Sequence, residues 1–402
     1  MKRGHLESNI LVLVTLALVA FGMVMVYSAT SASAAIGGGN PAYYLKRQGT
    51  YALLGLVLLV VARRWNYRAL RHLAPVLVLG SLLLLLVALA GGQSVNGARR
   101  WISFGGASFQ PSELAKVALA VWTALYLARR PVPRTLGELS KPIGLLTAVF
   151  CALVLAEPDL GTVIALCLMV GAMLLVAGAP VRMLASSSAI VGAVVLFAIW
   201  LEPYRRTRIF SFVNPWHDAQ GSGFQIVQAM IGLGSGGIFG KGLGQGVEKV
   251  FYLPEAHTDM IFAIIGEELG LVGATLVIAA YAAFAWAGLR IALRCQDPFG
   301  KALAVGITTL VCGQAALNLA AVVGMAPLTG IPLPFVSYGG TSLVVMLAAV
   351  GILLNIARSD GVEAAADLRD RRRRDSRPRP ARARRRASAP RPRRERQLRR
   401  LA

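Results

Sequence analysis

Runs of about 20 apolar residues recur along the 402-residue chain, and this pattern constrains the fold more than any other feature. A helix of that length spans the hydrocarbon core of a bilayer. Only 15% of the residues are charged, against about 25% in a typical soluble domain, and the alternating pattern of membrane β-strands is absent. The sequence therefore predicts an all-α polytopic membrane protein.

The apolar runs define the expected topology. We expect about ten spans, near residues 10–28, 50–63, 73–91, 112–128, 142–156, 160–178, 181–201, 258–290, 301–324 and 338–357. The first run lacks a small-residue cleavage site, so we interpret it as a retained helix. A long outer loop, from about Glu202 to Thr258, separates spans 7 and 8, and loops of this length are usually functional or disordered.

Basic residues in the short connections predict which side faces the cytoplasm. If the spans alternate, one side carries Lys2, Arg3, Arg63, Arg64, Arg68, Arg71, Arg129, Arg130, Arg134, Lys141, Arg182, Arg290, Arg294 and Lys301. That side is expected to be cytoplasmic, with both termini inside. The polar segments "GGQSVNGARRWISFGGASFQPSE", "EPDLGT" and "MAPLTGIPLPFVSYGG" fall on the other side with the long loop. We therefore expect one outward-facing site assembled from several loops.

The C-terminal segment differs from the rest of the chain. Residues 1–358 form the expected membrane domain, whereas residues 359–402 are rich in arginine and contribute strongly to the net charge of +23. A segment with few large apolar residues cannot bury a core, so we predict a disordered cytoplasmic tail beside anionic membrane lipids. No recognition motif accompanies the charge, so we do not expect nucleic-acid binding.

Two other patterns bear on metal or nucleotide binding. The four cysteines lack metal-ligand spacing and imply no disulfide framework. The stretch 232–246, "GLGSGGIFGKGLGQG", suggests a dinucleotide fingerprint but lacks the preceding strand, so we expect backbone flexibility or a tight re-entrant turn. Before it, "FQIVQAMIGL" predicts a short interfacial helix with Gln225 and Gln228 on one face.

Ionisable residues within or beside the spans are functional candidates. Glu113 and Lys116, in "QPSELAK", are three residues apart and share a helical face. They form either an ion pair that shields both charges from lipid, or an acid–base pair that lines a polar cavity. Asp159, in "EPDLGT", either caps the following helix or orients a lysine or a metal in the same cavity.

Several arginines lie on the outer side, against the positive-inside trend. Arg99 and Arg100 either snorkel to lipid headgroups or capture an anion, because guanidinium groups suit phosphate geometry. Arg205, Arg206 and Arg208 have the same two alternatives, and for them we favour anchoring at the end of a helix.

The stretch "YLPEAHTDMIFAIIGEELG" places acidic residues at the start of a long apolar helix. Asp259 either caps this helix or acts in catalysis. Glu267, about two turns deeper, could line one polar track with Asp259, whereas Glu268 points away and needs another partner. His257 could be a base, a ligand or an interfacial hydrogen bonder.

Taken together, these segments resemble the SEDS family of shape, elongation, division and sporulation proteins, which includes FtsW and RodA. The resemblance covers roughly residues 10 to 358 and excludes the arginine-rich tail. It rests on "NGARRWISFGGASFQPSELAK", "EPDLGT", "GFQIVQAMIGLGSGGIFGKGLGQG", "YLPEAHTDMIFAIIGEELG" and "GIPLPFVSYGGTSL", which occur in the expected order.

The resemblance implies a ten-span glycosyltransferase that polymerises lipid II into peptidoglycan at the outer face of the bacterial cytoplasmic membrane. It assigns Asp259, Glu113 and Lys116 to catalysis, with Asp259 as the general base. We expect substrate contacts from Arg99 or Arg100, Asp159, His257, Gln228 and Ser337. The sequence departs from the family pattern at Met260, where Phe is usual, and at Glu157, where Gln is common.

The implied leaving group is undecaprenyl pyrophosphate, whose charge Lys116 and the arginines would offset. No cofactor is certain, and a Mg²⁺ or Mn²⁺ ion could share this role, although no ligand set in the sequence requires a metal. The implied partner is a class B penicillin-binding protein, a transpeptidase, with other proteins of the divisome or elongasome. The "YLPEAHTDM" stretch favours an FtsW-type division enzyme over a RodA-type elongation enzyme.

Two other functions fit the same residues. A lipid II flippase or another carrier would use intramembrane charges, but the polar groups cluster on one side and no repeated half is visible in the sequence. A non-catalytic scaffold for a penicillin-binding protein would need Asp259 only as a helix cap.

Overall fold

The computed structural model describes residues 5–36, 40–95, 98–104, 107–201, 203–250 and 253–375. Within these ranges, nine helical stretches are long and apolar enough to cross a membrane. They lie on α1 (His5–Ile36), α2 (Tyr43–Arg64), α3 (Leu70–Gly91), α6 (Leu145–Ala156), α7 (Leu160–Ala177), α8 (Val181–Leu201), α11 (Ile261–Arg294), α12 (Pro298–Val322) and α13 (Gly340–Asp375). The prediction of a helical polytopic membrane protein is confirmed, with a short sheet in addition.

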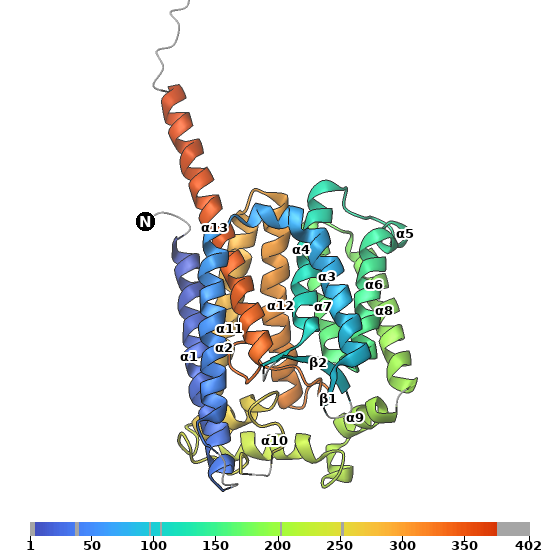
Figure 1. The fold of residues 1–402 in the computed structure, drawn as a ribbon, viewed down its shortest axis with the longest axis vertical. Coiled ribbons are helices and arrows are strands. Elements are labelled where there is room, and N and C mark those ends of the chain that lie inside the picture. Colours follow the sequence, from blue (N-terminus) through green and yellow to red (C-terminus); the bar gives the residue numbers. More distant parts are fainter. Residues whose placement is uncertain are drawn as a thin grey trace, which may run out of the picture. The chain divides into compact units, whose positions relative to one another are not determined.

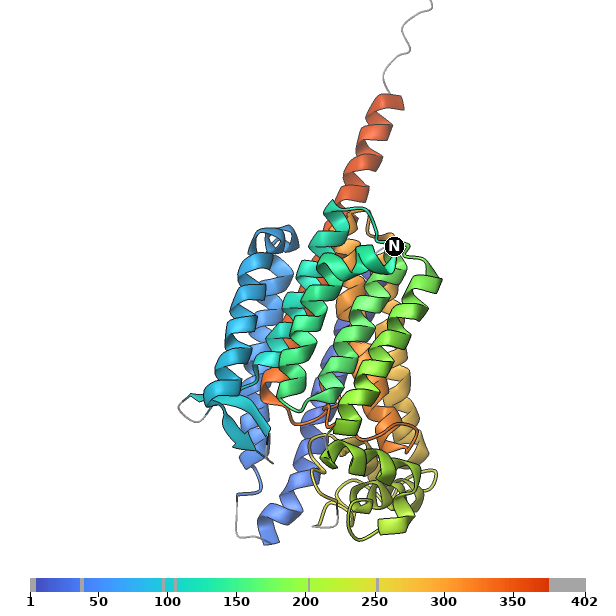
Figure 2. The same cartoon turned by 90° about the vertical axis from the view of Figure 1, so that its right-hand side faces the viewer.

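A further long helix, α4 (Pro111–Arg129), packs against α3, α7 and α12 and runs alongside them (Figures 1 and 2). Its first two turns carry the charged residues Glu113 and Lys116. With α4 included, each predicted span coincides with one of these helices. Short helical turns precede two of them, η1 (Tyr67–Ala69) before α3, and α5 (Leu136–Leu139) with η2 (Ser140–Gly144) before α6.

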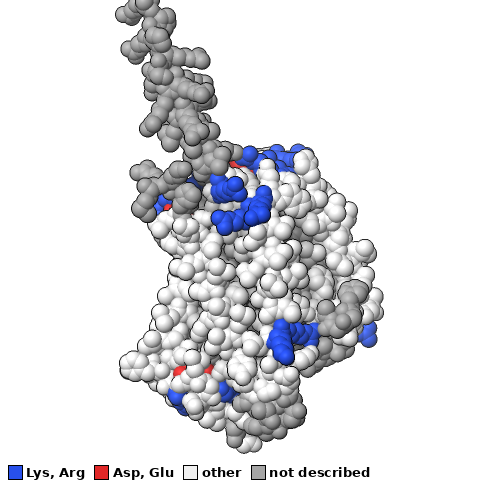
Figure 3. All heavy atoms as spheres, turned by 60° about the vertical axis from the view of Figure 1, so that its left-hand side comes forward, with Lys and Arg blue, Asp and Glu red and all other residues white. Residues whose placement is uncertain are grey.

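The centre of the bundle is formed by α11 and α12. About 67% of the apolar window of α11 and 61% of that of α12 are buried, against 11% for α8. α11 packs against α1, α10 and α12, and α12 also contacts α4 and α7. The peripheral helices expose apolar side chains such as Phe197 and Trp200 of α8. On the face drawn in Figure 3, an uncharged band separates groups of charged residues, as a bilayer requires.

Connecting segments gather at one end of the bundle, which we call the loop end (Figure 1). It carries α9 (Pro203–Val213), η3 (Pro215–Asp218), α10 (Phe224–Ser235) and the sheet β1 (Gln93–Val95), β2 (Ala98–Phe104) and β3 (Ala107–Phe109). The sheet is antiparallel in the order β1-β2-β3, with Ile102 opposite Phe109. The predicted helix at "FQIVQAMIGL" is confirmed as α10, and its position at the membrane interface stays a prediction.

α11 is interrupted at Gly270, whose φ is +65°. The segment 236–250, which we call the glycine-rich loop, supplies the hydrogen bonds that the interrupted helix lacks. The N–H groups of Leu271 and Val272 donate to the carbonyls of Gly237 and Ile238, at 2.9 and 3.1 Å. A Cβ at Gly240 would lie 2.2 Å from the carbonyl oxygen of Glu268, so only glycine permits this approach. Of the two predicted alternatives, backbone flexibility and a tight re-entrant turn, the described loop shows tight backbone turns, with positive φ at Gly237, Gly240, Gly242 and Gly244.

The C-terminal segment differs from its prediction. The chain divides into two compact units, Met1–Gly361 and Val362–Ala402. α13 continues to Asp375, so the tail that we predicted to be disordered from residue 359 begins as a helix. Alanine, leucine and arginine are strong helix formers, and they are frequent in residues 363–374. Residues 376–402 lie outside the described part of the chain.

Candidate active site

Asp259 lies two residues before α11 begins, in the turn formed by residues 253–260. Met260 occupies the N-cap position of α11, and no side chain caps the helix. The capping alternative for Asp259 is therefore wrong. Instead, its Oδ1 accepts a hydrogen bond from Thr258 Oγ1 at 3.3 Å.

The backbone of this turn is fixed by two other segments. The buried Asn318 of α12 donates through Nδ2 to the carbonyls of Asp259 and Ile331, at 2.7 and 2.8 Å. The N–H of Tyr338 donates to the carbonyl of His257 at 2.9 Å. Gly330 lies close to the carboxylate, because a Cβ there would be 4.0 Å from Asp259 Oδ2. Asp259 is thus held between α12 and the segment 328–338.

Burial raises the pKa of Asp259 to about 6, and the negative charge of Glu255 adds to this effect. Arg208 opposes the shift by its positive charge. A carboxyl group with a pKa near 6 is still mostly deprotonated at neutral pH, and it is more basic than an ordinary carboxylate. Its environment is therefore suited to taking up a proton from a substrate hydroxyl.

Arg208, from the long loop, reaches this region. It lies on α9, and its Nη1 donates to the carbonyl of Leu328 at 3.1 Å. Arg206, on the same helix, lies over the ring of Trp200 instead, 5.8 Å from its centroid. From the sequence we favoured helix-end anchoring for all three arginines of this loop. Their order along the chain does not show which one faces the segment 328–338.

His257 belongs to an aromatic group beside Asp259. Its ring centroid lies 4.7 Å from that of Tyr44 on α2 and 5.5 Å from that of Tyr338. Burial lowers the pKa of His257, and Glu255 opposes this effect. The sequence did not indicate that α2 contributes to this group.

Glu113 and Lys116 form the predicted ion pair on α4, with 2.8 Å between Lys116 Nζ and Glu113 Oε1. Lys116 is fully buried and Glu113 is 3% exposed. Two neighbouring acceptors, Glu113 Oε2 and Ser112 Oγ, are buried without a hydrogen-bond partner among the described residues. Such unsatisfied groups are costly in a folded protein and are typical of sites that bind water or a ligand.

The segment 328–341 connects this pair with the Asp259 turn. At its far end, the Oγ1 of Thr341 accepts from the N–H of Gln110, immediately before α4, at 3.3 Å. The same hydroxyl donates to the carbonyl of Ser108 at 3.0 Å. Among the described residues, no hydrogen bond or ion pair links Asp259 directly to Glu113 or Lys116. Their meeting in one pocket stays a prediction.

Arg99 and Arg100, adjacent in β2, have different environments. Arg100 donates through Nε to the carbonyl of Glu157 at 2.6 Å and through Nη2 to that of Pro158. It therefore fixes the "EPDLGT" turn. Arg99 is exposed, and nothing in the described part of the chain binds its guanidinium.

Asp159 and Glu157 flank the same turn. Asp159 caps α7, because its Oδ1 accepts from the N–H of Thr162 at 3.0 Å and its Oδ2 from the Thr162 hydroxyl at 2.8 Å. Of its two alternatives, the cap is the arrangement found. Glu157 is fully buried, and burial together with Asp159 raises its pKa to about 8. A neutral Glu157 explains how this position, where Gln is common in the resembling family, accommodates a carboxyl group.

Ser337 and Gln228 are the two remaining candidates for substrate binding. Ser337 is 3% exposed, and its hydroxyl accepts from the N–H of Leu333 at 2.8 Å, which closes the turn. On α10, it is Gln225 that reaches the Asp259 turn, with 3.4 Å between its Nε2 and the carbonyl of Pro254. Gln228 is partly buried. Roles for Ser337 and Gln228 in substrate binding stay predictions.

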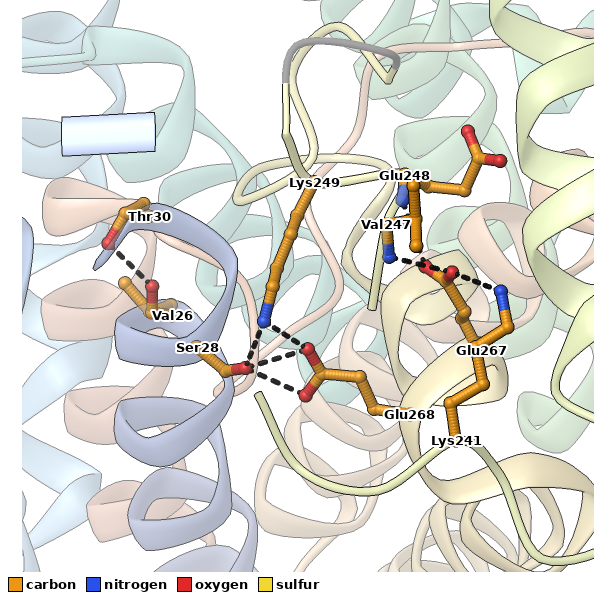
Figure 4. A network of polar contacts seen from close by, with 9 residues as sticks. All are labelled: Val26, Ser28, Thr30, Lys241, Val247, Glu248, Lys249, Glu267 and Glu268. Carbon is orange, nitrogen blue, oxygen red and sulfur yellow. Dashed lines mark hydrogen bonds and ion pairs between the residues drawn. The ribbon is translucent and has the colours of Figure 1, made fainter. Parts of the chain in front are cut away.

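The proposed polar track of Asp259 and Glu267 is wrong. Glu267 binds Lys241 and the backbone of the glycine-rich loop, and Glu268 binds Ser28 and Lys249 (Figure 4). A separation of eight residues places Asp259 and Glu267 on neighbouring faces only if the helix includes both. α11 begins after Asp259, so this geometry does not apply.

No group of three or more His, Cys, Asp or Glu side chains in the described ranges is arranged to hold a metal ion. Cationic side chains are the groups that the described site offers to an anionic ligand. Among the described residues they are the exposed Arg99, Arg208 near Asp259, and the buried Lys116, which is paired with Glu113.

These features define a polytopic membrane protein whose segments meet around a desolvated carboxylate at one end of a helical bundle. Comparison with known proteins gives its family. This chain belongs to the FtsW/RodA/SpoVE family, described as cell cycle proteins, whose model matches residues 8–361. The resemblance noted in the sequence is thereby confirmed.

Individual relatives cover most of the chain. A protein of Geobacter sulfurreducens named probable peptidoglycan glycosyltransferase FtsW is 44% identical over 351 residues, which are 87% of this chain and 94% of that protein. Stage V sporulation protein E of Bacillus subtilis is 40% identical, covering 87% of this chain and 96% of that protein.

Solved structures agree with this assignment. One belongs to a peptidoglycan synthase complex in which polymerization and crosslinking are coordinated, with a TM-score of 0.73, 32% identity, and coverage of 87% of this chain and 97% of that chain. Thermus thermophilus RodA matches with a TM-score of 0.65 and 31% identity, over 87% of this chain and 96% of that chain.

Proposed function

We propose that this chain is a peptidoglycan glycosyltransferase of the FtsW type, which polymerises lipid II into glycan strands during cell division. The observation that carries the proposal is the partly buried, unusually basic carboxylate of Asp259, whose backbone carbonyl accepts a hydrogen bond from Asn318 of α12. The names of the relatives support the same activity and the division role. An elongation role of the RodA type is the alternative within the family.

In the proposed reaction, a sugar hydroxyl of one lipid-linked chain attacks the anomeric carbon of another. A carbon–oxygen bond forms, and the bond from that carbon to undecaprenyl pyrophosphate breaks. Asp259 takes the proton of the attacking hydroxyl as general base. Lys116, with its partner Glu113, and Arg99 would offset the negative charge on the leaving pyrophosphate.

The proposed orientation places the loop end outside the cytoplasmic membrane and both termini inside. Basic residues support it, because Arg63, Arg64, Arg290 and Arg294 lie at the ends of α2 and α11 that are remote from the Asp259 turn. Lipid II carries its sugars and pyrophosphate on the outer side, so a polymerase must open in that direction.

We also propose that a class B penicillin-binding protein, acting as transpeptidase, binds this chain together with other proteins of the division machinery. Support comes from the similar chain in a peptidoglycan synthase complex that coordinates polymerization and crosslinking. Coupling of the two activities requires that the new glycan leave the polymerase close to the crosslinking enzyme.

Purified protein supplied with labelled lipid II in liposomes tests the function directly. Polymer formation that depends on Asp259 supports the glycosyltransferase. Transfer of lipid II between leaflets without polymer would indicate a flippase. If the protein does neither but activates a penicillin-binding protein, it is a scaffold.

The polymerisation rate is expected to fall as the pH drops below about 6. Only deprotonated Asp259 can act as general base, so protonation removes activity. Because burial raises its pKa, this loss occurs at a higher pH than for an ordinary aspartate, whose pKa is about 3.9. Initial rates between about pH 5 and 8 measure the effect, and a flat profile over this range contradicts the assignment.

Substitution of Arg99 and substitution of Arg100 should have different effects. Arg99→Gln is expected to raise KM for lipid II about tenfold, because an exposed cation that contacts pyrophosphate is lost. Arg100→Gln removes the bonds to the "EPDLGT" turn and is expected to lower the free energy of unfolding by about 1–3 kcal/mol. Steady-state kinetics and thermal unfolding in detergent distinguish them. Equal effects on KM would contradict the assignment of Arg99.

A further inference from the structure

Two consecutive glutamates of α11 are fully buried and have no part in the proposed chemistry. Glu267 accepts three hydrogen bonds, and all of them come from the glycine-rich loop. Lys241 Nζ and the N–H of Val247 lie 2.8 Å from Oε1, and the N–H of Glu248 lies 3.2 Å from Oε2 (Figure 4). The carboxylate therefore fastens this loop to the first turns of α11.

Glu268 makes a second connection on the other side of the helix (Figure 4). The hydroxyl of Ser28 on α1 lies 2.8 and 2.7 Å from its two oxygens, and Lys249 Nζ lies 2.6 Å from Oε1. Lys249 also reaches Ser28 Oγ at 3.2 Å and is 4% exposed. Together, the two sets of contacts join α1, α11 and the glycine-rich loop. We call these five residues, Ser28, Lys241, Lys249, Glu267 and Glu268, the clasp.

The backbone continues this connection toward Asp259. The N–H of Leu253 donates to the carbonyl of Glu248 at 2.8 Å, so the end of the loop is bonded to the start of the 253–260 turn. The N–H of Met260 donates to the carbonyl of Glu255 at 3.4 Å within the turn. The glycine-rich loop leads into this turn and α11 leads out of it, so the clasp fixes the turn from both sides.

Stability alone does not account for the clasp. Desolvation of buried charges offsets most of their attraction, so buried ion pairs contribute little net stability compared with apolar side chains of similar volume. Their hydrogen bonds, however, require one arrangement of the partners. Close packing of the glycines adds to this requirement, because a Cβ at Gly246 would lie 2.9 Å from Glu267 Oε2.

We propose that the clasp positions Asp259 for the reaction, so that Glu267 and Glu268 are positioning residues rather than catalytic ones. The proposal rests on the proposed function, because it explains how the turn that carries the base is held. The glutamates act through the loop and the turn, and they do not touch substrate.

Glu267→Gln provides the first test. In the wild type, three donors share the two carboxylate oxygens of Glu267. The glutamine amide has only one oxygen, so its NH₂ group must face at least one of these donors. Lys241 is partly exposed, so the variant leaves no fully buried cation. We expect kcat to fall at least about tenfold, because a small displacement of a catalytic group lowers the rate by this much or more. KM should change less than about twofold, because the glutamate does not touch substrate.

The pH profile separates positioning from mere loss of folded protein. A displaced turn exposes Asp259 to water, so the acid limb of the rate profile should move below its wild-type position near pH 6. Glu255 and Arg208, the charged groups that act on Asp259, are unchanged in the variant. A lower rate with the acid limb unmoved would overturn the proposal.

A matched control exists between the same two helices. Glu7 of α1 is 4% exposed and pairs with Arg294 at the other end of α11, with 2.5 Å between Arg294 Nη1 and Glu7 Oε1. Glu7→Gln removes a buried carboxylate there without touching the glycine-rich loop. We expect its kcat and pH profile to match the wild type, and the same shift in Glu7→Gln as in Glu267→Gln would overturn the proposal.

A double variant tests the proposal without the misfolding that an unpaired buried charge could cause. Lys249→Met/Glu268→Gln removes both charges, so no unpaired charge remains buried. Hydrogen exchange followed by mass spectrometry should show faster exchange in residues 240–258 for this variant and for Glu267→Gln, but not for Glu7→Gln. Wild-type exchange and wild-type kcat in both clasp variants would overturn the proposal. If the wild type itself makes no polymer, the proposed function fails, and the exchange difference still decides whether the clasp holds the turn.

Discussion

Asp259→Asn is expected to reduce polymerisation of lipid II by about 10²- to 10⁴-fold, the usual contribution of a positioned general base. The amide has nearly the same shape but cannot take up the proton of the attacking hydroxyl. Folding should be preserved, because the raised pKa of Asp259 means that its charged form is disfavoured by the native environment. Gel assays of the glycan product measure activity, and thermal unfolding in detergent measures folding.

Glu255→Gln is the matched control for this substitution. Glu255 lies on the same turn and is exposed, its negative charge acts on Asp259, and its Oε2 accepts from the Thr258 hydroxyl at 2.9 Å. We expect a rate close to the wild type at neutral pH and an acid limb at a slightly lower pH, since a neighbouring negative charge is lost. An Asp259→Asn variant that keeps wild-type activity would exclude Asp259 as the base.

Lys116→Met is expected to lower the free energy of unfolding by about 3–5 kcal/mol and to abolish polymerisation. The substitution leaves the buried carboxylate of Glu113 without its cation, which is the costly way to break a buried ion pair. Thermal unfolding of the purified variant measures the first effect. The polymerisation assay, made at a temperature where the variant is folded, measures the second.

The double variant Glu113→Gln/Lys116→Met separates a structural ion pair from a functional one. Removing both charges should restore most of the stability, because replacing a buried pair with uncharged groups is often neutral. If the pair only shields charge from lipid, activity returns as well. We expect the double variant to remain inactive, since Lys116 is then absent from the leaving group. Activity within about twofold of the wild type would show that the pair is structural.

The membrane-spanning helices could be predicted from the sequence because their signal is local. Each span needs about 20 apolar residues, and the boundaries of α7 and α8 agree with the predicted 160–178 and 181–201 within a residue or two. The ion pair of Glu113 and Lys116 was predictable for the same reason, since a separation of three residues on one helix fixes the geometry. The short sheet was missed, because its strands contain only three to seven residues.

The candidate site was predictable in its residue types but not in its contacts. Arg208, Asn318 and Tyr44 reach the Asp259 turn from three different helices, and no pattern of residues along the chain indicates this. Glu267 was assigned to the wrong partner because the prediction continued the helix through Asp259. Its true partners, in the glycine-rich loop, depend on how that loop folds back onto Gly270.

The sequence by itself determined the membrane character of this protein, its spans, its family and the acidic residue at position 259, because hydrophobic length and motif order are properties of the chain alone. Tertiary structure decided which charges meet. A carboxylate such as Glu268 is neutralised by whichever group packing brings within about 3 Å, here a lysine 19 residues away and a serine 240 residues away. Such pairings arise only when helices distant in sequence pack together, since burial then makes an unpaired charge too costly to retain.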